Sequence, residues 1–212
     1  MIELVAFLGN PGKEYFRNRH NAGFMLAEKL PFYDALTWQK KFNGSYAVIE
    51  KNRLADYSSA LSEASRIHFI KPGTYMNLSG GPVSKAASFF KIKNDAVLVV
   101  HDELELPLGT VSLKFGGGLG GHNGLRSVKA SFGTADFWRI RIGIGRPDKR
   151  APGEGGPPGS GEGIVDWVLS DFIPAEEETL SKVLEAGAEL LLAVFAGAPE
   201  KLLGEWAKKK IQ

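Results

Sequence analysis

The stretch ELVAFLGNPGKEYFRNRHNAG, residues 3–23, contains most of the signals that decide the fold. Its first seven residues form a short apolar run that leads into a Gly-Asn-Pro-Gly turn, which is typical of a buried strand followed by a loop. The run AGFMLAEKL, residues 22–30, has helical spacing, and Asn21 is suited to be its N-cap. The order strand, loop, helix therefore predicts that His20 lies at a loop-to-helix junction.

The same alternation continues along the chain. Helical stretches such as VSKAASFFKI, residues 83–92, separate some of the apolar runs. This pattern predicts an α/β fold: one globular domain with a mixed twisted β-sheet flanked by helices. The further strand candidates are SYAVIE (45–50), RIHFIK (66–71), AVLVVHD (96–102), TVSLKF (110–115) and FWRIRIGIG (137–145).

We expect residues 1–212 to form a single domain, because no repeat or composition shift divides the chain. Residues 151–163 are rich in proline and glycine and predict a mobile surface loop. The run GIVDWVLSDF, residues 163–172, reads as strand-like. A long helix is expected to begin at Pro174, and a second helix to close with the basic run Lys208–Lys210.

Composition narrows the function. The chain has 43% hydrophobic and 24% charged residues, which is ordinary for a globular protein. Zero cysteines exclude disulfides, thiolate metal sites and a cysteine nucleophile. Zero cysteines and an N-terminus without a signal-like apolar segment favour a cytoplasmic protein. The apolar runs are too short to span a bilayer, so we expect no membrane partner. We also expect a monomer without a protein partner. A net charge of +2 does not by itself predict a nucleic-acid binder.

Polar residues stand at the ends of apolar runs, where parallel α/β sheets bind ligands. Asn10 and Asp102 follow strand candidates, and Asn77 follows the KPGTYM loop. Asp102 could accept a hydrogen bond from His20 Nδ1 and so make His20 a general base. Two structural readings stay open at this point: His20 as a packed or surface side chain, and Asp102 as a turn cap.

No usual nucleophile accompanies this pair, because the chain has no G-x-S-x-G elbow and no cysteine. A His-Asp dyad would then have to activate water, with amide donors from Asn10, Asn77 and Asn123. We expect neither a cofactor nor a metal, because there is no H-E-x-x-H and the histidines show no ligand spacing.

The fragment GGGLGGHNGLRS, residues 116–127, places five glycines before a His-Asn pair that opens a helical pattern. Free backbone N–H groups at such a helix start suit anions or carbonyl oxygens. A flexible loop without a ligand is the alternative, and the fragment alone does not decide between them.

Five motifs together closely resemble those of the bacterial peptidyl-tRNA hydrolase family, in the family's order along the chain. They are FLGNPGKEYFRNRHNAGF, KPGTYMNLSG, HDELELPLG, GGGLGGHNGLRS and FWRIRIGIGRP. The resemblance implies a single α/β globule with a mixed sheet. It also implies hydrolysis of the ester between a peptide and the tRNA 3′ end, which recycles tRNA from aborted translation.

Residue by residue, the resemblance implies that His20 is the catalytic base and that Asp102 orients it. The implied substrate-binding set is Asn10, Tyr15, Met76, Asn77, His122 and Asn123, with Tyr15 near the terminal nucleotide. Lys114 and Arg141 match a basic pair that clamps a tRNA phosphate. Further candidates for RNA contacts are Arg126, Lys129 and the run Lys208–Lys210, whose alternative is a solvated helix end.

Two alternative functions remain open at this point. Some relatives of the family serve as RNA-binding factors in intron splicing without hydrolase activity, so the fold alone does not guarantee catalysis. A peptidase-like hydrolase with the same dyad is a third reading, but amides need a stronger catalyst than activated water. Retention of His20, Asp102 and the three asparagines favours the hydrolase of peptidyl-tRNA.

Overall fold

The structure is a computed structural model that describes residues 1–57, 61, 65–147 and 161–211. Its strands are β1 (Leu4–Phe7), β2 (Gln39–Lys41), β3 (Gly44–Glu50), β4 (Arg66–Pro72), β5 (Val97–Glu103), β6 (Thr110–Phe115), β7 (Trp138–Gly143) and β8 (Lys209–Lys210). Its α-helices are α1 (Ala22–Glu28), α2 (Gly80–Phe90), α3 (Asn123–Phe132), α4 (Gly161–Leu169) and α5 (Glu177–Ala196).

All of these strands belong to one sheet in the order β2-β3-β4-β1-β5-β7-β6-β8. The four central strands β4, β1, β5 and β7 are parallel, and the outer pairings are antiparallel. All four residues of β1 are buried, as expected for a central parallel strand covered on both faces. The predicted fold class, a mixed α/β sheet flanked by helices, is confirmed.

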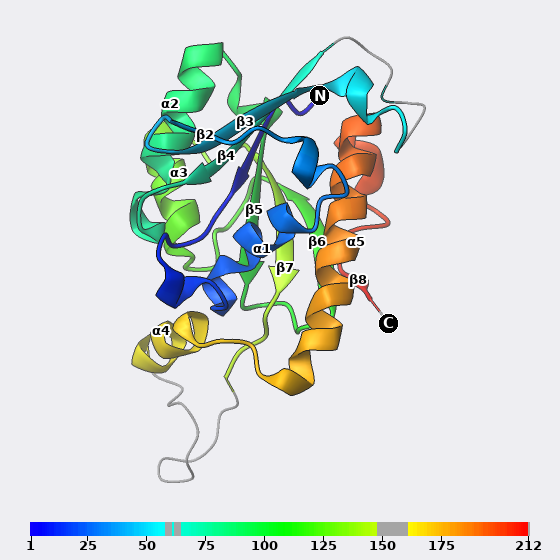
Figure 1. Cartoon of the computed structure of the whole chain (residues 1–212). Helices are drawn as coiled ribbons and strands as arrows, with labels where there is room; N and C mark the ends of the chain where they lie inside the picture. The colour runs from blue at the N-terminus through cyan, green and yellow to red at the C-terminus, as the bar shows by residue number, and fades with distance from the viewer. Residues whose placement is uncertain (58–60, 62–64, 148–160, 212) are drawn as a thin grey trace, which may run out of the picture.

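Helices cover both faces of the sheet. In Figure 1, α2 and α3 lie on one side of the strands, and α1 and α5 lie on the other. Each side has its own apolar cluster: Leu26, Leu190 and Leu191 belong to the cluster under α1 and α5, and Val83 and Leu125 to the one under α2 and α3. None of the helices in the described ranges is long and apolar enough to cross a membrane.

The parallel direction of β1, β4 and β5 decides where the site can form. The carboxyl ends of these strands meet at one edge of the sheet. Asn10 follows β1 there, the 3₁₀ turn η6 (Met76–Leu78) follows β4, and Asp102 lies at the end of β5. The sheet therefore gathers residues that are far apart in sequence.

The strand-like reading of residues 163–172 was wrong, because most of this run forms helix α4. Its apolar residues Ile164, Trp167 and Val168 are spaced by three and four, which places them on one helical face. The β-branched residues of the run misled the interpretation. Residues 161–163 of the expected loop open α4, and the rest of that loop, residues 151–160, lies outside the described residues. The single-domain boundary of 1–212 stays a prediction.

The prediction of a second C-terminal helix was also wrong. After α5 the chain forms a short 3₁₀ turn, Pro199–Leu202, and then β8, which pairs with β6. Lys210 lies opposite Thr110, so the run Lys208–Lys210 does not end a helix. This segment pairs with the edge of β6. Backbone pairing and the burial of Trp206 outweigh the helical propensity of the segment.

Candidate active site

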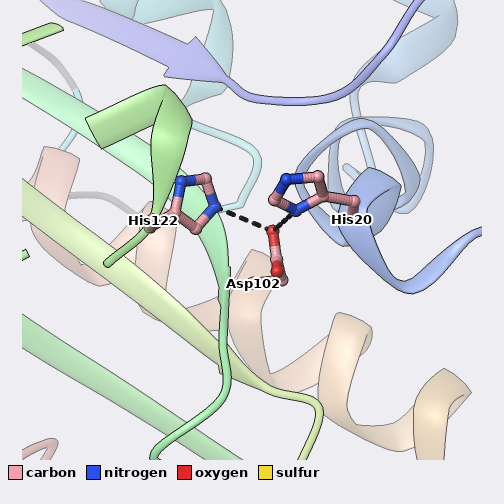
Figure 2. A group of neighbouring side chains, drawn as sticks. All are labelled: His20, Asp102 and His122. Carbon is pink, nitrogen blue, oxygen red and sulfur yellow. Dashed lines mark hydrogen bonds and ion pairs between the residues drawn. The ribbon is translucent and has the colours of Figure 1, made fainter. Parts of the chain in front are cut away.

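Two histidines meet one carboxylate at the edge of the sheet. His20 belongs to the 3₁₀ turn η2 (Arg19–Asn21), Asp102 to the end of β5, and His122 immediately precedes α3. His20 Nδ1 and His122 Nε2 each lie 2.9 Å from the same oxygen, Asp102 Oδ1. Figure 2 shows the two rings on opposite sides of the carboxylate. The predicted His20–Asp102 contact is present, and His122 joins it.

The hydrogen bonds of His122 determine its tautomer. Its Nδ1 accepts from the backbone N–H groups of Gly124 and Leu125, as the N-cap of α3. A nitrogen that accepts these bonds carries no proton, so the proton of the neutral ring sits on Nε2 and is donated to Asp102. His122 is therefore a fixed donor on one side of the carboxylate.

His20 is arranged differently. Its Nδ1–H donates to Asp102, which leaves Nε2 with a lone pair and without a bonded partner among the described residues. The ring is 8% exposed, and Asp102 is 2% exposed. An oriented imidazole with one open nitrogen is the geometry of a general base.

Burial and charge oppose one another in this pair. Burial lowers the pKa of His20, but the charge of Asp102 and its hydrogen bond raise it, and the pKa ends above its usual value. Burial raises the pKa of Asp102, yet the two histidines and their hydrogen bonds hold that pKa well below its usual range. The carboxylate thus stays ionised and favours the proton on His20.

His20, Asp102 and His122 also form the one group of metal-ligand side chains in the described part of the chain, with donor atoms within 4.8 Å of one another. The sequence indicated no such grouping. A metal would need a lone pair on His122 Nε2. However, Nδ1 accepts hydrogen bonds from two backbone N–H groups, which places the ring proton on Nε2. The donor set therefore fits a hydrogen-bonded triad better than a cation site.

Asn10 is held in a defined orientation beside the triad. Its Oδ1 accepts from the backbone N–H of Met76, so its Nδ2 is turned away from that contact as a donor. Asn21 fastens the same loop, because its side chain bonds both the backbone N–H and the carbonyl of Asn10. The Asn10 amide is thus preorganised by partners from two other segments.

The other implied substrate residues occupy different environments. Asn77 in η6 and Asn123 at the start of α3 are exposed, and each directly follows a residue of the site in the sequence, Met76 and His122 respectively. Met76 is buried in the core cluster under α2 and α3. A side chain at Gly124 would collide with its sulfur, so this glycine permits the close packing of η6 on α3.

Two tyrosines form an aromatic pair on adjacent loops. Tyr15 is half-buried and meets the exposed Tyr75 edge to face, with ring centroids 6.2 Å apart. Tyr75 directly precedes Met76, so the pair lies next to the loop that bonds Asn10. Sequence reasoning identified Tyr15 through the family and missed Tyr75.

The basic pair lies on neighbouring strands, as predicted. The antiparallel pairing of β6 and β7 sets Lys114 opposite Arg139 and Ser112 opposite Arg141, so the three cations share one face of the sheet. Arg141 bonds Ser112 Oγ and lies 3.4 Å from Glu103. Burial lowers the pKa of Lys114, and the charges of Arg139 and Arg141 lower it further.

Several residues around the site were missed because nothing in a sequence reports burial. Arg19 is 2% exposed, pairs with Glu176 and stacks over Trp167 at 3.8 Å.

His101 is buried behind His122 and donates from Nδ1 to the Asp102 carbonyl, and burial holds the pKa of His101 well below its usual value. Arg139 was overlooked beside Arg141. The signal available for these residues was their position next to a recognised motif residue.

A cavity of about 1010 Å³ runs between α1, the β2–β3 hairpin and the loop after β4. It reaches the site at Asn10 and Asn21, and none of the three triad residues lines it. The triad therefore lies beside the cavity, and the geometry of the triad identifies the candidate site better than the size of the cavity does.

Fold and site together define a class: an α/β protein of hydrolytic type, with an aspartate-oriented histidine and an oriented amide. Among the described residues no hydroxyl group bonds either nitrogen of His20. Water is then the nucleophile that this arrangement can activate.

The chain belongs to the peptidyl-tRNA hydrolase family, whose sequence model matches residues 4–212. It is 45% identical over 213 residues to the peptidyl-tRNA hydrolase of Treponema pallidum (strain Nichols), covering 99% of this chain and 96% of that protein. It is 45% identical over 201 residues to that of Rhodospirillum centenum (strain ATCC 51521 / SW), covering 94% and 78%. The crystal structure of the Acinetobacter baumannii peptidyl-tRNA hydrolase has a TM-score of 0.73 at 32% identity, covering 96% and 91%.

Proposed function

We propose that His20 and Asp102 carry out the hydrolysis of peptidyl-tRNA, the reaction of the family to which this chain belongs. The substrate is the ester between a peptide, or an N-blocked aminoacyl group, and the 3′ ribose of tRNA. The observation that carries the assignment is the 2.9 Å bond from His20 Nδ1 to Asp102 Oδ1, which leaves the lone pair of Nε2 to accept a proton.

In the proposed mechanism, His20 Nε2 removes a proton from water as the water oxygen attacks the ester carbonyl. The carbonyl π electrons move onto oxygen, and the Asn10 Nδ2 amide donates to this oxyanion. When the intermediate collapses, the bond to the ribose oxygen breaks, and that oxygen takes the proton from the His20 imidazolium. The products are a free peptide acid and tRNA, and the base is restored.

The remaining roles follow the family resemblance. Lys114 and Arg141 are proposed to clamp a tRNA phosphate, where a charged donor adds affinity without touching the ester. Tyr15 is proposed to stack near the terminal nucleotide. The proposed substrate-lining set is completed by Met76, Asn77, His122 and Asn123.

We also propose that the protein acts in the cytoplasm as a monomer and needs no cofactor. The absence of cysteine suits a reducing compartment. One chain supplies every residue of the triad, so the site needs no second subunit.

The test is incubation of the purified protein with an N-blocked aminoacyl-tRNA, followed by separation of charged and free tRNA. We expect release of free tRNA by the natural chain and very little by His20→Ala. Binding of the tRNA without release would identify an RNA-binding protein that has lost the reaction. Equal release by both proteins would remove His20 from the mechanism.

A further inference from the structure

Arg139 is an almost fully buried cation on β7 whose side chain, among the described residues, bonds backbone carbonyls and no carboxylate. It is 1% exposed. Its Nη1 donates to the carbonyl of Gly118 at 2.9 Å, and its Nη2 donates to the carbonyl of Gly116. One guanidinium thus holds the glycine-rich loop, residues 116–121, at two points.

This loop needs an anchor more than most loops do. Gly116, Gly117, Gly120 and Gly121 all have positive φ, between 57° and 78°, a region that other residues rarely enter. Glycine makes these angles accessible, but it also gives the loop many alternative conformations and a high entropic cost of ordering. Two charge-assisted hydrogen bonds from a rigid strand restrict that freedom.

The anchored loop leads directly to the triad. The backbone N–H of His122 bonds the carbonyl of Leu119, which closes the end of the loop. His122 then caps α3 through Nδ1 and donates from Nε2 to Asp102. Hydrogen bonds, together with the backbone between Gly118 and Leu119, therefore link Arg139 to the carboxylate that orients His20.

The surroundings of Arg139 disfavour a positive charge. Burial, and then the charge of Arg141, lower the pKa of Arg139 to about 10, while Glu103 opposes the effect. A buried cation without a bonded carboxylate costs folding free energy, which its hydrogen bonds must offset. What an arginine supplies at this position is a planar fork that reaches two carbonyls at once.

We propose that Arg139 is a positioning residue, which acts through the glycine-rich loop to hold His122 against Asp102. This inference rests on the proposed function, since its readout is the hydrolysis step. Arg139 does not touch the substrate ester in this scheme.

The first test uses Arg139→Met, which keeps the volume but cannot donate, and Arg139→Lys, which keeps the charge but loses the fork. The substrate is a short N-blocked aminoacyl oligonucleotide with the tRNA 3′ end, so that the phosphate clamp plays no part. Both variants should lower kcat by up to roughly 100-fold, as misplaced catalytic groups do, with little change in KM. Full activity of Arg139→Lys would show that charge suffices and would overturn the proposal.

The second test is a double-mutant cycle between Arg139→Met and His122→Ala on the same substrate. If Arg139 acts through His122, Arg139→Met should change kcat by less than about 2-fold in the His122→Ala background, where there is no His122 ring left to position. Additive losses would mean that Arg139 supports activity by another route, and the proposal would be dropped.

The third measurement separates positioning from folding. The ring nitrogens of His122 are followed by ¹⁵N NMR in the natural chain, in Arg139→Met and in Ile67→Ala, a core variant at the opposite end of β4 from the site. Only Arg139→Met should shift the His122 signals from a fixed Nε2–H tautomer toward an average, a readout that remains when kcat falls. Unchanged His122 signals in Arg139→Met would contradict the proposal. Failure of the natural chain to release tRNA would instead refute the proposed function.

Discussion

The two segments that face Asp102 differ in how they are held. The N-terminal wall, residues 10–21, carries His20 and has a single glycine, Gly12. The glycine-rich wall, residues 116–125, carries His122 and contains six. Each wall is anchored by one buried arginine, but Arg19 pairs with a carboxylate and stacks on an aromatic ring, whereas Arg139 binds two backbone carbonyls.

The two walls differ in the interactions that hold them in place. The turn that carries His20 is tied to the segment after α4 by the Arg19–Glu176 pair and by a backbone bridge between Asn18 and Asp171. The glycine-rich wall is restrained mainly by backbone hydrogen bonds. The proposed base therefore lies on the wall that an ion pair and a backbone bridge tie to another segment, and the second donor to Asp102 lies on the glycine-rich wall.

The largest expected effect tests this division of roles. His20→Ala should lower kcat on the order of 10² to 10⁴-fold, the usual value of general-base assistance, while tRNA still binds. His122→Ala should lose less, because it removes a donor to Asp102 and not the base. Single-turnover rates on N-blocked aminoacyl-tRNA measure both. A larger loss in His122→Ala would reverse the roles of the two walls.

The next effect concerns Asp102, which both walls share. The raised pKa of His20 means that activity falls as pH drops through that pKa, because the protonated ring is no base. Asp102→Asn removes the charge that raises the pKa, so the acidic limb of the kcat/KM profile should move to lower pH. The rate at the plateau should also fall, but less than in His20→Ala. An unmoved limb would show that the limb does not report His20.

A third variant measures the anchor of the N-terminal wall. Arg19→Ala leaves Glu176 without its partner and removes the stacking on Trp167. We expect a loss of about 3 kcal/mol in the free energy of unfolding, as for other broken buried ion pairs. Urea denaturation gives the value, and Arg66→Ala, which breaks an exposed pair with Glu50, is the control, for which we expect little or no loss of stability. Similar losses in both would show that Arg19 is no special anchor.

A smaller effect is expected from the phosphate clamp. Lys114→Ala with Arg141→Ala should raise KM for full-length substrate and leave kcat nearly unchanged. The slope of log affinity against log salt should flatten by about 1 to 2 units.

Lys114→Ala alone keeps the Arg141–Glu103 contact and separates charge loss from disturbance of the fold. The exposed Lys85→Ala on α2 is the control for a general loss of charge. An equal loss on a short 3′ fragment would rule out the clamp.

Removal of metal ions is the change from which we expect no effect on activity. Prolonged treatment with EDTA should leave activity intact, because the His122 tautomer directs a proton and not a lone pair at Asp102. Hydrolysis rates before and after treatment, with and without added zinc, measure this. Loss of activity that zinc restores would make His20, Asp102 and His122 a metal site.

Much of the site was predictable because its signals are local. Asn10 and Asp102 follow apolar runs, and His20 precedes a helical pattern, so their meeting at one sheet edge could be inferred. The errors came from one segment with conflicting local signals and from one whose helical preference was overridden. Most of residues 163–172 forms α4 despite the β-branched residues of the run, and Lys209–Lys210 joins the edge of β6.

The sequence by itself determined the α/β order of elements, the strand ends that carry polar residues and the resemblance to one family. These depend on periodicity and motif spacing, which are properties of neighbouring residues. Only the tertiary structure decided that His20 and His122, 82 and 20 residues away from Asp102, share one carboxylate oxygen. It also decided that Arg139 is buried under the glycine-rich loop. Such contacts are formed by packing between distant segments, whose relative placement no local pattern encodes.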